Sequence, residues 1–326
     1  MTSDTTPAAH GRAGALELTA AMGLSGTLGV FVLESGVSSS TVVLFRCVFG
    51  AVALAAYCLL RGHLRNTGLT RRSFALAALG GVFIVLNWVL LFDAYHRTSI
   101  SVATVVYHTQ PFYVVLLGVA LFRERLDRHR AGWILLAFAG VLLVAGLPGA
   151  GPGGHGYPLG VAEALLAALL YAFATVIAKR LTTVRPQLTA LIQVLVGIPL
   201  LLPFARLGET AGLGARWGWL VGLGVIHTCL MYVLLYSSYR KLSTDRIAVL
   251  SFVYPAVAIL VDLAVYGHRV GPLQALGVPL IAAAGLGVNL GWPLLPWRGR
   301  RPATADGTEP EATAPAAGLV QIGDPR

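Results

Sequence analysis

Asn87-Trp-Val-Leu-Leu-Phe-Asp-Ala-Tyr95 recurs in altered form as Met231-Tyr-Val-Leu-Leu-Tyr-Ser-Ser-Tyr239, at a spacing of 144 residues. Further pairs keep the same order in both parts of the chain, at spacings that vary slowly from 144 to 147 residues. They are Arg46 and Gln193, Gly50 and Gly197, Gly80 and Gly224, Pro111 and Pro255, Gly132 and Gly277, and Gly140 and Gly285. Loop insertions after a gene duplication produce such a drift. The sequence therefore predicts two homologous halves.

The composition indicates that these halves lie in lipid. Of 326 residues, 56% are hydrophobic and only 12% are charged, and the mean hydropathy is +0.74. Soluble chains carry about 25% charged residues. At about 20 residues per span, ten transmembrane helices would occupy about 200 residues and leave short loops. A large water-facing domain is excluded, as is a receptor that binds through long outer loops.

Ten apolar stretches are visible along the chain, and we expect each to be a transmembrane helix. They cover residues 14–33, 40–60, 73–95, 100–121, 131–147, 158–178, 187–205, 217–238, 246–266 and 272–292. Sustained alternation with a period of two is absent, and a helix satisfies its backbone polar groups within one segment. The predicted fold is an all-α polytopic membrane protein.

The chain divides at a Gly- and Pro-rich stretch near its middle. Residues 14–147 form the predicted first five-helix repeat, residues 148–157 a linker, and residues 158–292 the second repeat. Residues 1–13 precede the first span. Residues 293–326 are polar and rich in Pro, Ala and Thr, so we expect a disordered tail.

The positions of the basic residues predict the orientation. If the N-terminus is cytoplasmic, nineteen of the 24 Lys and Arg residues lie on the inside, four lie outside, and Arg46 lies within a span. This asymmetry follows the positive-inside rule, so both termini should be cytoplasmic. Because each half has five spans, an odd number, the second half must enter the membrane in the opposite orientation. The result is an inverted repeat, a common plan in secondary transporters.

Several other functions lack support in the sequence. The net charge of +10 comes from basic residues that punctuate apolar runs, so it is a topology signal and not a nucleic-acid-binding surface. Cys47, Cys58 and Cys229 lie inside apolar segments without metal-ligand spacing. No nucleotide-binding or serine-hydrolase motif is present. We therefore expect no cofactor, no metal and no catalytic residue, and the partners are the lipid bilayer and a small-molecule substrate.

At this point the chain resembles the EamA family of the drug/metabolite transporter superfamily. The resemblance rests on the two five-helix halves, on Arg46 early in the second span, and on the stretch from Ala103 to Leu126 with its Gln110-Pro111 pair. It implies a ten-helix carrier of the bacterial cytoplasmic membrane that exports small metabolites such as amino acids. Arg123 departs from the family pattern, in which Gly usually precedes the Glu equivalent to Glu124. Gly267-His-Arg269 departs from the second-half Gly-Glu-Arg.

Arg46 is the strongest candidate for a functional residue, because a guanidinium inside an apolar span costs about 2.5 kcal/mol or more unless it is paired or hydrated. It either faces a substrate site or fixes helix packing through a buried contact. Pro111 and Pro255 lie near the centres of the fourth and ninth spans and remove hydrogen bonds to Tyr107 and Ser251. Such helix kinks line cavities in transporters, although neighbouring helices can also satisfy them.

A set of polar and aromatic side chains at mid-membrane depth predicts a substrate site between the halves. Its members are Arg46, Asn87, Trp88, Tyr107, His108, Gln110, Gln193, His227, Tyr232 and Tyr254. Aromatic rings and amides suit zwitterionic or aromatic metabolites, although helix packing explains any single ring equally well. His108 and His227 are candidates for a coupling proton. The corresponding Glu17 and Glu163, and also Asp93 and Asp262, are expected at helix ends.

The predicted function is a secondary transporter that works by alternating access. One alternative is a drug or toxic-compound efflux carrier. Another is a polytopic membrane enzyme that acts on lipid-linked groups, with His108 or His227 and a carboxylate as acid and base. The mid-membrane depth of the polar set argues against the enzyme. The sequence leaves the substrate, the coupling ion and the oligomeric state open.

Overall fold

The computed structural model describes residues 7–65, 67–122, 128–145, 156–181 and 183–294. Within these ranges the chain is helical and has no strand, as the sequence predicted. Most of the expected linker 148–157, the Arg123–Glu124 pair, and the tail from residue 295 onward lie outside the described residues.

The first half forms six helices. They are α1 (Pro7–Ser35), α2 (Ser39–Leu60), α3 (Arg71–Arg97), α4 (Ile100–Tyr107), α5 (Gln110–Phe122) and α6 (Arg128–Ala145). The second half continues with α7 (Tyr157–Ala178), α8 (Pro186–Leu201), α9 (Trp217–Gly224), α10 (Met231–Tyr239), α11 (Thr244–Leu250), α12 (Val253–Tyr266) and α13 (Pro272–Leu290). Two 3-10 turns, η1 (Leu207–Thr210) and η2 (Gly214–Arg216), precede α9, and a π-helical segment, η3 (Val225–Leu230), joins α9 to α10.

Seven of the described helical segments are long and apolar enough to cross a membrane. They are Gly11–Ser35, Ser39–Leu60, Arg71–Arg97, Ile100–Leu121, Tyr157–Ala178, Gly214–Tyr239 and Pro272–Leu290. The apolar helices α8 and α12 are shorter, with 16 and 14 residues. The chain is therefore a multi-pass membrane protein.

Local sequence signals explain where several helices begin and end. Thr70 and Ser73 form a capping box at the start of α3, in which each side chain accepts the backbone N–H of the other residue. Ser99 accepts the N–H of Val102 and so caps α4. Helix α12 stops at Gly267, whose φ of +68° is readily adopted only by a residue without a Cβ.

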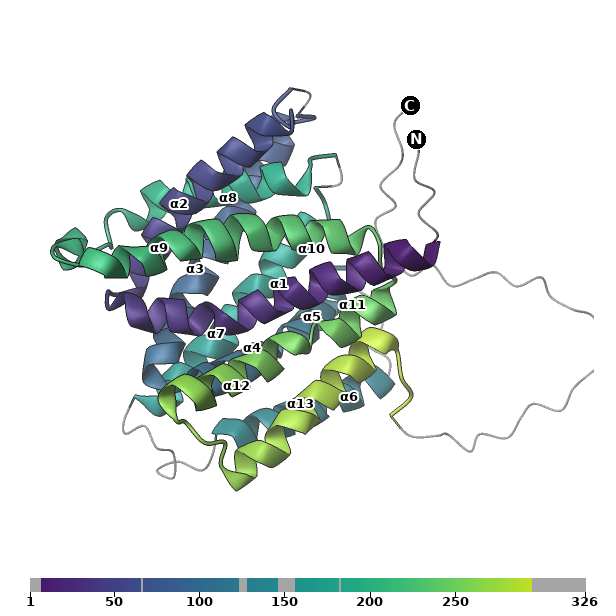
Figure 1. Ribbon diagram of the computed structural model, residues 1–326. Coiled ribbons are helices and arrows are strands. Elements are labelled where there is room, and N and C mark those ends of the chain that lie inside the picture. Colours follow the sequence, from purple (N-terminus) through teal and green to yellow (C-terminus); the bar gives the residue numbers. More distant parts are fainter. Residues whose placement is uncertain (1–6, 66, 123–127, 146–155, 182, 295–326) are drawn as a thin grey trace, which may run out of the picture.

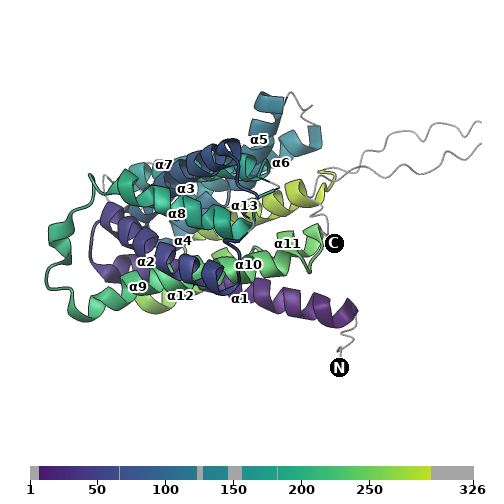
Figure 2. The ribbon, with the colours of Figure 1, turned by 90° about the horizontal axis from the view of Figure 1, so that it is seen from above.

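The helices form two layers closed by two pairs (Figures 1 and 2). One layer contains α1 packed between α10 and α12, and the other contains α7 packed against α3, α4 and α5. The pair α2–α8 closes one edge and the pair α6–α13 the other. Gly140 and Gly277 let the second pair approach closely, because a Cβ on Gly277 would lie 2.6 Å from the Gly140 carbonyl oxygen.

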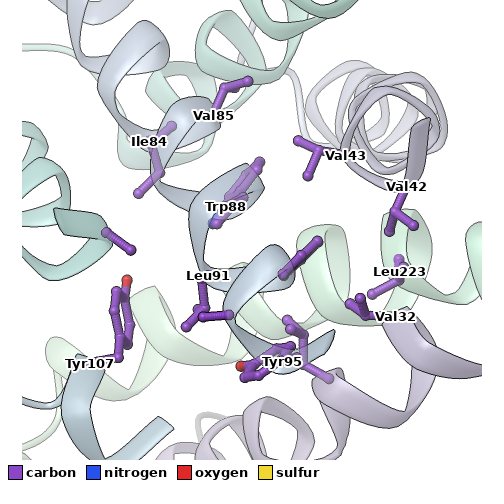
Figure 3. Packing of buried hydrophobic residues seen from close by; sticks show 14 of the residues in the cluster. Val32, Val42, Val43, Ile84, Val85, Trp88, Leu91, Tyr95, Tyr107 and Leu223 are labelled. Atoms are coloured by element: carbon purple, nitrogen blue, oxygen red, sulfur yellow. The ribbon is translucent and has the colours of Figure 1, made fainter. Parts of the chain in front are cut away.

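The buried core between the layers is apolar and aromatic. Trp88, Leu91 and Tyr95 of α3 point into it beside Val43 of α2 and Leu223 of α9 (Figure 3). It is here, in the apolar centre, that the polar side chains of the candidate site are held.

Two of the expected spans are interrupted. The fourth span consists of α4 and α5, and the helix is broken at His108 and Thr109. The ninth consists of α11 and α12, broken at Ser251 and Phe252. Pro111 is therefore in the first turn of α5, where its missing N–H removes no intrahelical bond. At the second break the Ser251 carbonyl accepts the N–H of Tyr254 instead of a bond from proline.

Candidate functional site

Arg46 lies on α2 with only 1% of its surface exposed, and it reaches across to the π-helical segment η3. Its Nε donates to Thr228 Oγ1 at 3.0 Å and its Nη2 donates to the His227 carbonyl at 3.1 Å. The guanidinium carbon lies 3.9 Å from the centroid of the Trp88 ring, which is a cation–π contact. Nη1 is buried and has no hydrogen-bond partner among the described residues.

The π-helical segment explains how Arg46 finds these acceptors. A π-bulge shifts the register of the backbone hydrogen bonds and turns a carbonyl away from the regular ladder. Here the His227 carbonyl accepts from Arg46, and the Thr228 hydroxyl donates to the carbonyl of Leu223 five residues earlier. Thr228 is a contact that the sequence did not single out, because a threonine inside an apolar span gives no pattern of its own.

Asn87 and Tyr107 form a second polar group beside Trp88. Asn87 is fully buried, and its Nδ2 donates to the Ala167 carbonyl of α7 at 2.6 Å and lies 3.2 Å from the Tyr107 hydroxyl. The Tyr107 ring contacts the Tyr171 ring of α7 edge to face at a centroid distance of 5.9 Å. These contacts join α3 to α4 and α7 at the helix break.

His108 and Tyr254 meet where the two interrupted spans cross. Their ring centroids are 5.0 Å apart, and the Tyr254 hydroxyl lies 3.2 Å from the hydroxyl of Tyr95. His108 Nδ1 lies 2.9 Å from the Thr104 carbonyl within its own helix. The two helix breaks and their polar side chains therefore lie together in the structure.

The remaining predicted site residues have different surroundings. His227 is fully buried on η3, with Nε2 3.1 Å from the Thr27 hydroxyl. Tyr232 is half-buried on α10 and close enough to Arg46 to interact with it electrostatically. Gln193 lies on α8 against α3, where a Cβ on Gly81 would come within 2.9 Å of its Cα. Gln193 is thus part of a close helix contact.

An open cavity of about 750 Å³ lies between α5, α6, α7 and α13. Gln110 and Pro111 line it at the helix break, with Tyr171 and Thr175 opposite on α7. Apolar side chains of α5, α7 and α13 form much of the wall, and Asn289 adds an amide. Gln110 Oε1 is buried without a hydrogen-bond partner within the described part of the chain. The volume lies within the range of ligand sites, about 300 to 1,000 Å³.

Basic residues border the cavity at one end of the helix bundle. Arg130 at the start of α6 and Lys179 and Arg180 just after α7 all belong to its lining. Of the residues predicted for the site, Gln110 and Pro111 line the cavity, and the others lie deeper or in helix contacts. Tyr171 connects the two regions, because it lines the cavity and also contacts Tyr107.

The two corresponding glutamates form ion pairs that are also equivalent in the repeat. Glu17 of α1 pairs with Lys241 after α10 at 2.5 Å, and Glu163 of α7 pairs with Arg97 of α3 at 3.0 Å. Lys241 follows Arg97 by 144 residues, the spacing of the repeat. Both ion pairs are present in the same structure. They connect α1 to the end of α10 and α3 to α7.

Asp262 is a buried carboxylate whose environment the sequence did not predict. It is fully buried on α12, and its Oδ2 accepts the backbone N–H of Ser101 in the first turn of α4 at 2.8 Å. Its Oδ1 lies 2.9 Å from His268 Nδ1. The carboxylate therefore caps a helix of the other half, where the positive end of the helix dipole favours it. The described residues contain no cluster of three His, Cys, Asp or Glu side chains that could hold a metal.

The sequence has relatives whose names agree on one general activity. The EamA-like transporter family matches residues 13–146 and again residues 158–290. An uncharacterized transporter, YxxF of Bacillus subtilis (strain 168), is 32% identical over 91% of this chain and 94% of its own length. An uncharacterized transporter of Archaeoglobus fulgidus is 26% identical over 82% of this chain and 92% of its own length. One protein crystal structure aligns with a TM-score of 0.60 at 21% identity, over 86% of this chain and 97% of the other, which shows the fold alone.

Proposed function

Because this chain belongs to the EamA-like transporter family, as its sequence predicted, we propose that it is a secondary transporter that exports small organic metabolites by alternating access. A membrane transporter is the common element of the family and of the named relatives. The direction of transport, the class of substrate and the alternating-access mechanism are the parts that we propose.

The observation that carries the proposal is the difference between the two ends of the bundle. At one end, the cavity of about 750 Å³ separates parts of α5 from α7 and α13. At the repeat-equivalent place, α12 packs closely on α1, where a Cβ on Gly26 would lie 2.6 Å from the Val257 side chain. A site open at one end and packed shut at the equivalent place is what one state of an alternating-access carrier requires.

The pattern of helix contacts supports ten spans in two inverted repeats with the boundaries 14–147 and 158–292. Helix α3 packs on α7 just as its equivalent, the span of α9 and α10, packs on α1. Helix α1 packs on α12 just as α7 packs on α4 and α5, and α3 packs on α8 just as α9 and η3 pack on α2. Exchanging the halves thus returns each of these contacts.

The positive-inside asymmetry supports the orientation, with Arg130 and Lys179 at the cytoplasmic mouth of the cavity and both termini on the same side. Reporter fusions after Leu64 and after Gly156 test it in the membrane of a bacterial host. The two fusions should report opposite sides, the first cytoplasmic. Fusions that report the same side would contradict the ten-span topology.

The substrate site lies between the helix breaks in this proposal. Gln110 and Tyr171 at the inner end of the cavity, Asn87 and Tyr107 beside them, and Arg46 with Trp88 and Tyr232 beyond provide polar and aromatic contacts. His108, His227 and Tyr254 complete the layer, whereas Gln193 lies in the contact between α8 and α3. A coupling proton would be carried by His108 or His227, the two imidazoles of this layer.

Labelling of single cysteines tests alternating access. In a background of Cys47→Ala, Cys58→Ala and Cys229→Ala, one variant carries Thr175→Cys in the cavity. Another carries Ser25→Cys, because Ser25 of α1 is the repeat equivalent of the cavity residue Tyr171. A neutral membrane-permeant thiol reagent should label position 175 and spare position 25, and a transported substrate should shift the two rates in opposite directions. Rates that never change for a compound already shown to be transported would contradict the proposal.

A further inference from the structure

The charge of the cavity lining is one-sided. Arg130 and Lys179 line its mouth, and no Asp or Glu is among the described residues that line it. The other lining groups are apolar or are neutral hydrogen-bonding groups, such as those of Gln110 and Thr175. A cleft bordered by charges of one sign in a low-dielectric wall concentrates ions of the opposite sign. The cavity thus attracts anions and repels cations.

A second positive charge lies deeper and points to the same ligand chemistry. Arg46 is almost completely buried, and within the described part of the chain no carboxylate forms an ion pair with it. Two of its nitrogen atoms donate to the neutral oxygens of Thr228 and His227, and Nη1 has no partner. A buried cation without a counter-ion is costly, and a guanidinium matches the geometry of a carboxylate.

The side chains packed between these charges are aromatic or neutral. Tyr171 lines the cavity and contacts Tyr107, Tyr107 lies beside Asn87, and Trp88 lies next to Asn87 and under the Arg46 guanidinium. A molecule with an apolar or aromatic body that moved inward from the cavity would meet these rings. An ammonium group would find no carboxylate among the described residues of the cavity lining.

We infer that the solute is a small organic anion with an apolar or aromatic body, drawn in past Arg130 and Lys179 and held at its carboxylate by Arg46. This assignment rests on the proposed function and names the charge of the substrate. It favours monocarboxylates over amino acid zwitterions and over cationic drugs, because Arg46 can pair with a carboxylate, whereas no described residue of the cavity lining can pair with an ammonium group.

Basic residues also collect on the inner side of membrane proteins for reasons of topology alone. The first experiment separates this explanation from anion selection and needs no knowledge of the substrate. Single-cysteine protein with Thr175→Cys is treated with two thiol reagents of similar size, the anionic sulfonatoethyl and the cationic trimethylammonioethyl methanethiosulfonates. The rate of each reagent with the protein is divided by its rate with a small free thiol, which removes the difference in intrinsic reactivity.

At position 175, we expect the corrected rate of the anionic reagent to be about ten or more times that of the cationic reagent. Arg130→Gln with Lys179→Gln should bring the ratio close to one. Arg72→Gln is the matched control, because Arg72 is also basic and exposed near the expected cytoplasmic side but does not line the cavity. A ratio near or below one in the parent, or a ratio that the double variant leaves unchanged, would overturn the inference.

The second experiment identifies the preferred charge with three compounds that share a ring and a chain. 3-Phenylpropionate is an anion, phenylalanine a zwitterion and phenethylamine a cation, and each is tested for protection of position 175 from a neutral thiol reagent. Protection by the anion alone, lost in Arg46→Gln and retained in part in Arg46→Lys, supports the inference. Better protection by phenylalanine or phenethylamine, or none by the anion, overturns it.

A lipid headgroup could supply the same anionic chemistry, so both experiments are run in phosphatidylcholine bilayers with and without phosphatidylglycerol. Slower labelling that appears only with phosphatidylglycerol would assign the cavity to lipid and overturn the solute assignment. The reciprocal labelling of positions 25 and 175 remains the test of alternating access. The two proposals can therefore fail separately: the preference for anions can be wrong while alternating access is correct, and alternating access can be wrong while the preference for anions is correct.

Discussion

The two halves of the chain share one order of helices but differ where they surround the centre. In the second half, Thr175 of α7 lines the cavity. In the first half, its repeat equivalent Gly29 lies in α1, and a Cβ there would be 2.7 Å from the Ile100 side chain. Glycine lets α1 approach its neighbours, whereas threonine holds space open. The same backbone plan is thus packed on one side and open on the other in this structure.

The differences continue along the contact between the second and eighth spans and its equivalent. Arg46 of α2 reaches the π-helical segment η3, whereas its equivalent Gln193 of α8 packs on Gly80 and Gly81 of an uninterrupted α3. Duplication therefore preserved the contact between the helices but placed the buried charge in only one copy. The comparison teaches that the two halves share a helix scaffold while equivalent positions in it carry side chains of different charge.

The largest expected effect concerns Trp88 and its repeat equivalent Tyr232. Trp88 is buried in the core under Arg46, so Trp88→Ala should cost about 3 to 5 kcal/mol of stability through the cavity it leaves. Tyr232 is half-buried, so Tyr232→Ala should leave protein in the membrane and weaken apparent affinity instead. Membrane abundance and transport per folded molecule measure the two effects. Equal loss of folded protein in both variants would contradict this distinction.

The next largest effect concerns Arg46 and its repeat equivalent Gln193, which are compared through Arg46→Met and Gln193→Met. Losing the charge-assisted bonds to a substrate carboxylate should cost about 1.5 to 3 kcal/mol, or about tenfold to a hundredfold in apparent affinity. Gln193→Met should change affinity little, because Gln193 lies in a helix contact. Uptake kinetics in proteoliposomes decide the matter, and similar affinity losses in the two variants would argue against a special role for Arg46.

The packed side should tolerate added volume less well than the cavity side. A valine at position 26 would meet Val257 and the backbone of Ala258, so Gly26→Val should destabilise the protein by about 1 to 3 kcal/mol. Thr175→Val adds no volume beside the cavity and should be close to neutral. Thermal unfolding of the purified variants measures both. An unchanged unfolding midpoint for Gly26→Val would mean that α1 and α12 are not tightly packed.

The smallest expected effect lies in the connections. Between α8 and α9, Glu209 Oε2 accepts the Ser38 N–H at the start of α2 at 2.8 Å, and this bond lowers the pKa of Glu209 below its ordinary 4.5. Because the folded-state pKa is lowered, the stabilisation is present above the ordinary pKa and is lost as pH falls through the lowered value. In the open loop it amounts to a few tenths of a kcal/mol.

Glu209→Gln should remove that part of the pH dependence. The difference in unfolding midpoint between the parent and the variant should be greatest near neutral pH and vanish toward about pH 3. A difference that grows as the pH falls would have the wrong sign for a carboxylate with a lowered pKa. The equivalent connection between α2 and α3 is the comparison. There Gly68 approaches the Thr183 carbonyl, and because this contact involves no carboxylate, it should add no pH dependence in this range.

The sequence by itself determined the membrane class, the family and the helical architecture. Apolar stretches of about 20 residues leave helices as the economical structure in lipid, and the matching pairs at spacings of 144 to 147 residues predict the two halves. It also identified Arg46, because a charge in an apolar run is visible without coordinates. The pairs Glu17 with Glu163 and Pro111 with Pro255 could be matched for the same reason.

Only the tertiary structure decided which of these residues meet. The register of η3 brings the His227 carbonyl and Thr228 to Arg46, and a π-bulge has no reliable signature in sequence. Tyr171 lies inside α7, Lys179 just after its end and Arg130 at the start of α6, and their joint lining of a cavity depends on how far α5 stands from α7 and α13. Such distances depend on side-chain volumes summed across several helices. A one-dimensional pattern records each helix but not the space between them.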